Sequence, residues 1–331
     1  MRAVYNTHMK KIVSLTLVAV LATSVLVEPA LAQQRRLITI ASGWVVGVYY
    51  PLAGAMSSIA YNAKTLNIRA TVEASGASVA NARLIATGEA DFALLQNDIA
   101  FYAFNGSTLA AFKGKPVKNM GGVFTIYPEL VHIVATQASG VRSVRDLKGK
   151  RVVLGPQGSG TEQNALQTLG VYGIKESDLG KAEHLDAGAA SEQLKNGGVD
   201  AGFFTTGLGS AVVLDMFVSG KVVMIPIDPV PAEALKQQYL FYTLEKIPAN
   251  TYRGQEREVL TPAVRAMLVA RSGLPEDLVY KFTGAIFDNL PQFHSAHPAA
   301  KGLTLQAAQN GMPVPLHPGA EKYYREKGIA R

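Results

Sequence analysis

The sequence predicts an α/β fold that is divided into two α/β units. Short runs of β-branched and apolar residues alternate along the chain with segments of helical periodicity. This alternation occurs in two sets, and several of the strand-like runs lead into a Gly- or Ser-rich turn before the next helix. Repeated β–α–β units predict a parallel sheet with helices on both faces. A chain of 331 residues is also long enough to divide into two domains.

The first set of elements begins with a β-branched strand at residues 37–40. Pro51 is favoured in the first turn of a helix, because its missing N–H would have no helical partner there. This helix continues through the apolar stripe Leu52, Met56, Ile59 and Ala60. The remaining elements expected in this set are strands at 68–73 and 92–95, each followed by a helix, over 79–87 and from Asn97.

The second set follows Gly149 and is expected to contain strands at 152–154, 201–204 and 222–227 and a helix over 162–169. The apolar run Leu130–Thr136 between the two sets predicts a crossover strand. We expect the chain to return from the second unit to the first at the proline-rich stretch Pro226, Pro229 and Pro231. The C-terminal part is expected to form helices over 262–270 and 275–289.

These elements divide the chain into two lobes that are joined by crossover strands and have a ligand cleft between them. The first lobe is expected to comprise residues 33–127 and 230–331, and the second lobe residues 128–229. The first 32 residues have the pattern of a secretory signal peptide, with Met9-Lys10-Lys11, an apolar stretch and the cleavage site Ala30-Leu31-Ala32. We therefore expect cleavage after Ala32 and a soluble, extracytoplasmic protein. An uncleaved membrane anchor is the alternative, but the apolar stretch is shorter than the ~20 residues that a transmembrane helix needs.

The composition excludes several classes of protein. With 48% hydrophobic and 17% charged residues, the chain is neither disordered nor collagenous nor a coiled coil. The absence of Cys excludes a disulfide framework, thiolate zinc sites and Cys nucleophiles. The formal net charge of +7 is modest and Lys and Arg are scattered, so we expect no nucleic-acid partner.

Gly-, Ser- and Thr-rich turns lead into helix N-termini in both units. In a parallel sheet such turns lie at the carboxyl ends of the strands, where open α/β sheets bind ligands. Helix N-termini present unpaired N–H groups and a partial positive charge, so several of them together favour a carboxylate or phosphate. The alternative for Ser75, Ser78 and Ser159 is that each is only an N-cap. The turns are SGWVVGVYYP (42–51), SGAS (75–78), QND (96–98) and GPQGSGT (155–161).

The aromatic residues Trp44, Tyr49 and Tyr50 lie in or beside the first of these turns. A Trp in a loop is less readily assigned to the core than one on a helix face. We expect at least one of the three to line the ligand.

Sequence motifs for catalysis are not found. GPQGSGT lacks the Lys of a nucleotide-binding P-loop, and neither GxGxxG nor GxSxG is present. His294 and His297 have a spacing that allows metal ligation, but Pro298 follows directly and a surface loop is the preferred interpretation. We expect no enzyme, no cofactor and no metal ion.

Five segments resemble the TAXI family, whose members are the extracytoplasmic solute receptors of tripartite ATP-independent periplasmic (TRAP) transporters. The resemblance covers essentially the whole mature chain. It implies a class II periplasmic binding protein whose two α/β lobes close over a small anionic solute, and a membrane permease as the partner. The segments are ITIASGWVVGVYYPLAGAMSSI (38–59), EASGASVANARLIATGEADFALLQNDIAFYAFNG (73–106), DLKGKRVVLGPQGSGT (146–161), GVDAGFFTTGLGSAVV (198–213) and PLHPGAEKYYREKG (315–328).

The resemblance also implies ligand-binding residues in the turns described above. Some members of the family bind glutamate, glutamine or 2-oxoglutarate. This chain has Trp44 where the family commonly has a small Thr or Ser, so the identity of the carboxylate-bearing solute stays open. The implied residues are Gly43, Gly47, Tyr49, Ser75, Ser78, Asn81, Gln96, Asp98, Ser159, Gly160, Thr161 and Gly207, to which we add Trp44.

We expect a monomeric solute-binding protein that delivers its solute to TRAP permease subunits. One alternative is a receptor for an ABC importer or a sensor kinase. Another is a secreted hydrolase that uses a Ser of a Gly-rich turn. A hydrolase needs a base within hydrogen-bond reach of that Ser, and neither His132 nor His184 flanks one of these turns.

Overall fold

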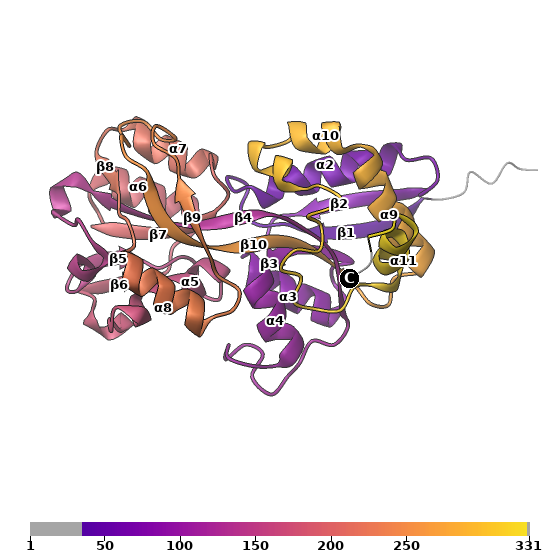
Figure 1. Cartoon of the computed structure of the whole chain (residues 1–331), viewed down its shortest axis with the longest axis horizontal. Coiled ribbons are helices and arrows are strands. Elements are labelled where there is room, and N and C mark those ends of the chain that lie inside the picture. Colours follow the sequence, from indigo (N-terminus) through magenta and orange to yellow (C-terminus); the bar gives the residue numbers. More distant parts are fainter. Residues whose placement is uncertain (1–34, 330–331) are drawn as a thin grey trace, which may run out of the picture. The chain divides into compact units, whose positions relative to one another are not determined.

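Two long strands, β4 (Met120–Thr136) and β10 (Val259–Arg271), run antiparallel through the middle of one twisted sheet (Figure 1). The computed structural model describes residues 35–329, so the expected signal peptide lies outside the described residues. The order of the sheet is β2-β1-β3-β10-β4-β7-β5-β6, with β8 paired to β4 and β9 to β10. Both long strands therefore contribute to two groups of elements, which we call the first and second lobes.

The first lobe is built on three parallel strands, and its helices cover both faces of them. Ile38, Phe92 and Leu268 point into the core under α2, α9 and α11, whereas Ala93 and Met267 point into the core under α3 and α4. This alternation is the period of two that a strand imposes on its side chains. The elements are β1 (Arg36–Ala41), α2 (Tyr49–Asn62), β2 (Ile68–Glu73), α3 (Ser78–Thr87), β3 (Phe92–Gln96), α4 (Asn97–Asn105), α9 (Glu276–Asp288), α10 (Leu290–Ser295) and α11 (Pro318–Glu326).

The second lobe repeats this arrangement on a smaller sheet. Strand β5 pairs in parallel with β6 and β7, and β7 pairs antiparallel with β4. Helices α5 and α8 cover one core and α6 and α7 the other. The elements are β5 (Arg151–Val153), α5 (Gly160–Val171), β6 (Lys181–Glu183), α6 (Ala187–Asn196), β7 (Ala201–Thr206), α7 (Ala211–Val218), β8 (Val222–Met224), α8 (Pro229–Gln238) and β9 (Thr243–Ile247).

Two expectations about the crossings between the lobes are wrong. The segment 262–270 was expected to be a helix, but it lies inside strand β10. Alternate residues of this strand face different cores, so both sets are apolar and the run carries no clear period. The proline-rich stretch does not return to the first lobe, because Pro229 and Pro231 begin helix α8. The crossover strand expected at 130–136 is confirmed, and it starts earlier, at Met120.

The lobe boundaries stay a prediction, and the packing favours a later second boundary than residue 230. Ala232, Leu235 and Tyr242 belong to the same buried cluster as Val131 and Ile133 of β4. We therefore propose that the second lobe continues to the middle of β10.

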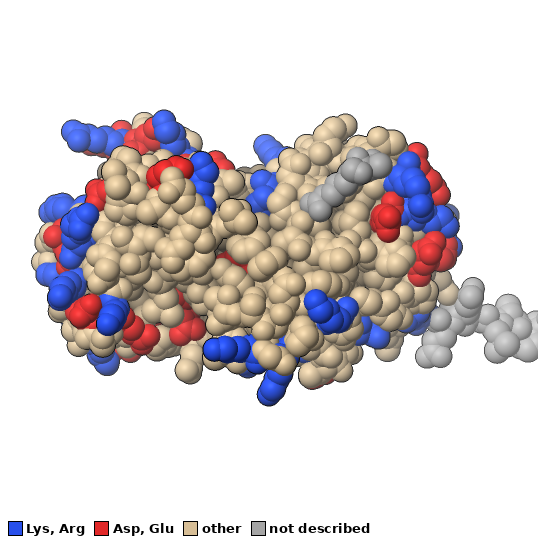
Figure 2. Space-filling model, turned by 60° about the horizontal axis from the view of Figure 1, so that its bottom comes forward, with Lys and Arg blue, Asp and Glu red and all other residues tan. Residues whose placement is uncertain are grey.

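Charged side chains do not gather into a continuous basic strip on the face shown in Figure 2, where Lys and Arg lie singly or beside Asp and Glu. Within residues 35–329, no helix combines the length and apolarity required to cross a membrane.

Candidate functional site

A cavity lies where the N-terminal ends of four helices meet. The first residues of α2, α3 and α5 line it, together with Gln96, which directly precedes α4. Thr205 and Thr206 at the end of β7 complete the wall from the second lobe. In this conformation the cavity holds about 30 Å³, room for one or two water molecules. The lining residues are Gly43, Trp44, Gly47, Val48, Tyr49, Ala77, Ser78, Gln96, Glu129, Gly160, Thr161, Thr205 and Thr206.

Three buried polar atoms in this wall have no hydrogen-bond partner. They are the indole Nε1 of Trp44, the amide Oε1 of Gln96 and the hydroxyl Oγ1 of Thr205. Gln96 is 3% exposed and Thr205 5% exposed, so protein atoms surround both side chains. Burying a polar group without a partner costs roughly 1–3 kcal/mol, which a bound molecule can offset by pairing with it.

Glu129 of β4 is a buried carboxyl in the same wall. The hydroxyl of Tyr49 donates to Glu129 Oε2 at 2.8 Å, and the hydroxyl of Tyr127 lies 3.3 Å from Oε1. Burial raises the pKa of Glu129 to about 8, although the hydrogen bonds from both Tyr residues act in the opposite direction. The carboxyl is therefore mostly protonated at neutral pH.

The turn before α3 is held in place by Ser75 and Asn81. The amide of Asn81 donates to the carbonyl of Ser42 at 2.5 Å and to that of Leu94 at 2.6 Å. Its Oδ1 accepts from Ser75 Oγ at 2.6 Å. Ser75 and Asn81 therefore hold the turn in position without lining the cavity themselves.

Ala77, between this turn and α3, has a strained backbone. Its φ is 68° and its ψ −147°, a conformation that glycine adopts far more readily. Such a residue costs about 1–3 kcal/mol, and strain of this kind gathers at binding sites. The next residue, Ser78, accepts a hydrogen bond from Gln96 N at 3.1 Å, which joins the start of α3 to the end of β3.

The start of α5 brings the second lobe to the cavity. Ser159 is the N-cap of this helix, since its Oγ accepts from Glu162 N at 3.1 Å. Gly160 follows, and a Cβ at this position would collide with Oε1 of Gln96 from the first lobe. A larger residue here would therefore force the Gln96 amide out of its position between the two lobes.

Asp98 belongs to a buried polar network outside the cavity wall. Asn164 Nδ2 of α5 donates to Asp98 Oδ2 at 3.1 Å and to the hydroxyl of Tyr242 at 2.8 Å. Gln167 of the same helix accepts from Tyr242 at 2.7 Å and donates to Tyr102 of α4 at 3.1 Å. Burial raises the pKa of Asp98 to about 7. The network ties α4 of the first lobe to α5 of the second.

The structure brings together eight of the thirteen expected site residues and places five outside the cavity wall. Gly207 packs closely against Tyr127 and Ala299, where a Cβ would lie 2.9 Å and 3.0 Å from their side chains. The ligand-binding role of all thirteen stays a prediction. The residues in the wall are Gly43, Trp44, Gly47, Tyr49, Ser78, Gln96, Gly160 and Thr161, and those outside it are Ser75, Asn81, Asp98, Ser159 and Gly207.

Five lining residues were not expected: Val48, Ala77, Glu129, Thr205 and Thr206. Glu129 carried a signal, because a charged residue directly precedes the apolar crossover run 130–136 and lies within strand β4. Thr205 and Thr206 follow the expected strand 201–204 at its carboxyl end, so the rule used for the other turns applies to them as well.

His294 and His297 have local structural roles. His294 Nε2 lies 2.9 Å from the carbonyl of Leu303, and His297 Nδ1 accepts from Ala299 N at 3.1 Å. Among residues 35–329, no group of three or more His, Cys, Asp and Glu is arranged to hold a metal ion.

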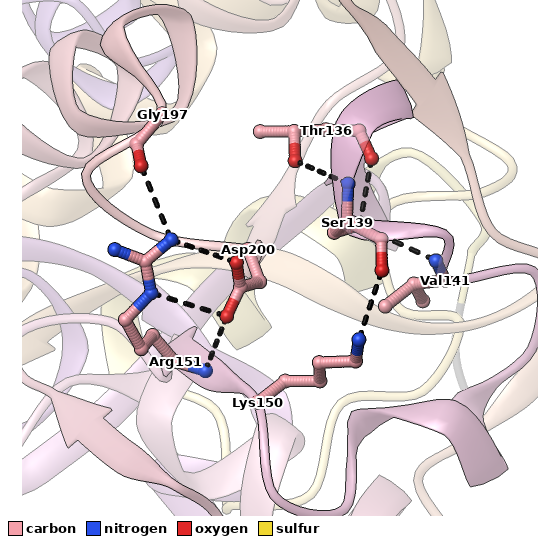
Figure 3. Close-up of polar contacts among 7 residues, drawn as sticks. All are labelled: Thr136, Ser139, Val141, Lys150, Arg151, Gly197 and Asp200. Carbon is pink, nitrogen blue, oxygen red and sulfur yellow. Dashed lines mark hydrogen bonds and ion pairs between the residues drawn. The ribbon is translucent and has the colours of Figure 1, made fainter.

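A larger hollow of about 600 Å³ lies in the second lobe beside Arg151 and Asp200. The polar groups beside it that Figure 3 draws are paired within the protein. Arg151 donates to both carboxylate oxygens of Asp200 and to the carbonyl of Gly197, and Lys150 beneath it donates to the carbonyl of Ser139 at 2.8 Å. Despite its volume, this hollow has none of the unpartnered buried atoms that mark the cavity between the helix ends.

The fold is similar to that of solved solute-binding proteins. PhnD1 from Prochlorococcus marinus in complex with methylphosphonate superposes with a TM-score of 0.56 at 12% identity, over 89% of this chain and 99% of that one. MatC from Rhodopseudomonas palustris with bound malate gives a TM-score of 0.56 at 16% identity, over 89% and 98%. An ancestral arginine-binding protein bound to arginine gives 0.50 at 14% identity, over 81% and 100%.

At these identities the similarity shows the fold, which is that of the periplasmic binding proteins, as the sequence predicted. The sequence itself matches the NMT1-like family over residues 40–328. The chain therefore belongs to the NMT1-like family.

Proposed function

We propose that this protein is the periplasmic solute receptor of a TRAP transporter of the TAXI type, which captures a small carboxylate-bearing solute and delivers it to the membrane permease. The observation that carries the proposal is the set of unpartnered buried atoms on Trp44, Gln96 and Thr205, three residues that line one cavity from two lobes. The five segments that resemble TAXI receptors support the choice of transporter. The signal-peptide pattern of residues 1–32 supports the periplasmic location.

Capture requires the lobes to separate, because about 30 Å³ is too small for a solute. Trp44 and Gln96 belong to the first lobe and Gly160 and Thr205 to the second, so separation opens the wall between them. A solute favours the closed form only by as much as it binds that form better. Hydrogen bonds to a charged carboxylate contribute roughly 1.5–3 kcal/mol each, so three or four are sufficient for micromolar affinity after ordering costs.

The test of this site is a pair of glycine substitutions in helix α5. Gly160→Ala places a Cβ where Gln96 Oε1 lies, whereas a Cβ at Gly170 has no neighbour within 4 Å. Wild type and both variants are titrated by calorimetry with a panel of carboxylates, amino acids, phosphonates and sulfonates. We expect Gly160→Ala to lose binding and Gly170→Ala to keep it. Wild-type affinity in Gly160→Ala would show that the solute binds elsewhere.

The transporter class is tested with the permease encoded beside the receptor, reconstituted in vesicles. Uptake that depends on an ion gradient and not on ATP is expected. ATP-dependent uptake would assign the receptor to an ABC importer instead. Turnover of ester or phosphate substrates by the purified protein would contradict both assignments.

A further inference from the structure

The charges around the cavity restrict the kind of carboxylate that fits it. Among residues 35–329, Glu129 is the only acidic side chain that lines the cavity, and no Lys, Arg or His lines it. Within the wall, positive potential therefore comes from the N-termini of α2, α3, α4 and α5, which are 14, 10, 9 and 12 residues long. Each helix end carries about half a positive charge and offers free N–H groups, so a carboxylate is favoured at these ends.

We propose, on the basis of the proposed function, that the solute is a short monocarboxylate with a hydrogen-bond donor beside its carboxylate, as in a 2-hydroxy or 2-amino acid. A second carboxylate lowers the affinity.

The unpartnered atoms in the wall require a donor on the solute. Gln96 Oε1 can only accept a hydrogen bond, Thr205 Oγ1 can accept or donate one, and Trp44 Nε1 can only donate. A plain fatty acid offers acceptors alone, so it would leave Gln96 Oε1 buried without a partner. A hydroxyl or ammonium group beside the carboxylate supplies the missing donor. Sites built around a polar partner discriminate strongly against analogues that lack it.

Within residues 35–329, a second carboxylate would find no Lys, Arg or His side chain in this wall. Besides the polar groups, the wall presents the apolar side chains of Val48 and Ala77 and the carboxyl of Glu129. Burying a charge without a counter-charge costs more than burying a neutral polar group.

The test compares acids that differ in one group, by calorimetry on the full mature protein at pH 7. Lactate is compared with propanoate, which lacks the hydroxyl, with alanine, which carries ammonium instead, and with malate, which adds a carboxylate. We expect lactate or alanine to bind about tenfold more tightly than propanoate and malate about a hundredfold more weakly than the better of the two.

The possible outcomes separate this inference from the proposed function. If malate or 2-oxoglutarate binds at least as tightly as lactate and alanine, or propanoate matches them, the inference is overturned, but the receptor function stands as long as Gly160→Ala abolishes that binding. If only a phosphonate or sulfonate binds, the inference again fails alone. If no member of the wider panel binds, the receptor function itself is contradicted.

A matched pair of Thr→Val substitutions tests the role of the wall atoms. Thr205 Oγ1 and Thr168 Oγ1 are both buried and unpartnered, but only Thr205 lines the cavity. Thr205→Val should change the ratio of lactate to propanoate affinity, or of alanine to propanoate affinity, by about threefold or more, while Thr168→Val leaves it unchanged. Equal ratios in Thr205→Val and wild type, with both proteins folded by melting temperature, would contradict the assigned contact.

Discussion

Glu129 combines two properties that rarely occur together, because it is a carboxyl in a binding cavity and it is almost fully buried, with 4% exposure. Its pKa in the folded protein is about 8, above the value of about 4.3 for an unfolded chain. Between these values the folded state binds more protons than the unfolded state. Stability contributed by this group is therefore fully present below pH ~4 and is lost as the pH rises through 8.

The first prediction concerns the pH dependence of unfolding. Glu129→Gln removes the titration and keeps an acceptor oxygen for one of the two hydroxyls of Tyr49 and Tyr127, while its NH2 group can donate to the oxygen of the other. Wild type should lose up to about 1.4 kcal/mol per pH unit from this group between about pH 5 and about pH 8, and the variant should lose correspondingly less. Asp98, with a pKa of about 7, acts in the same direction in both proteins.

Urea unfolding at several pH values measures this difference. The exposed Glu256 provides the control, since Glu256→Gln should follow the wild-type profile. Parallel profiles for Glu129→Gln and wild type would show that Glu129 does not titrate differently in the folded and unfolded states.

At the same scale, the sequence predicted the residues of the site that lie in turns. Gly43, Ser78 and Gly160 each precede or begin a helix after a strand, and this local pattern places them at one edge of the sheet. Glu129 could not be assigned in this way, because its position in the cavity depends on how β4 pairs with β7 and β10. Ser159 lies in such a turn but outside the cavity wall, because its hydroxyl accepts a hydrogen bond from Glu162 N and caps helix α5. The local sequence pattern does not distinguish a capping Ser from one that contacts a ligand.

At the scale of elements, two glycines show how the same residue type can weaken a helix or permit a strand contact. Gly54 lies within α2, and a Cβ there would meet nothing within 4 Å. Gly121 lies in β4, and a Cβ there would be 2.9 Å from Cα of His317. The C-terminal segment depends on this approach, since Gly122 donates to the carbonyl of Pro315 at 2.8 Å and accepts from His317 N at 2.9 Å.

The second prediction is that these two glycines respond to Ala in opposite ways. Gly54→Ala should stabilise the protein by about 0.5–1 kcal/mol, because Ala favours a helix interior. Gly121→Ala should destabilise it by about 1–3 kcal/mol, because backbone atoms must move apart. Thermal and urea unfolding of both variants measure the difference. A neutral Gly121→Ala would show that the segment containing His317 is not held against β4.

Helices α2, α3, α4, α5 and α9 and most strands of both lobes followed from hydrophobic periodicity, as did the crossover strand β4, whereas the second crossing, β10, did not. Strand β2 has the predicted bounds, residues 68–73, because one of its faces is more exposed and the alternation is visible. Strand β10 is buried on both faces, so its residues 262–270 show a continuous apolar run that resembles a buried helix. Only pairing with β3 and β4 identifies it as a strand.

At the scale of the whole molecule, contacts between α4 and α5 stabilise the closed arrangement of the lobes. Asn164 links Asp98 to Tyr242, and Gln167 links Tyr242 to Tyr102. Residues 98 and 102 belong to the first lobe and residues 164 and 167 to the second. Separating the lobes therefore breaks hydrogen bonds between buried groups and exposes these groups to water. The hydrogen bonds thus lower the free energy of the closed form relative to the open form.

The third prediction concerns the equilibrium between the closed and open forms. Asn164→Ala removes the donor to Asp98 and Tyr242, so the fraction of closed molecules and the apparent affinity for solute should both fall, by about fivefold or more. Asn105→Ala, at the exposed end of α4, is the control and should change neither.

Trp44 makes the fall in closure measurable without a solute. It is the only Trp in the chain, and it packs against the buried cluster of the second lobe that contains Phe204 and Val212. Opening withdraws the indole from that cluster, so acrylamide should quench its fluorescence more strongly in Asn164→Ala than in wild type. Lower affinity with unchanged quenching would mean that Asn164 acts on the cavity itself, whereas higher quenching with unchanged affinity would mean that the solute does not select the closed form.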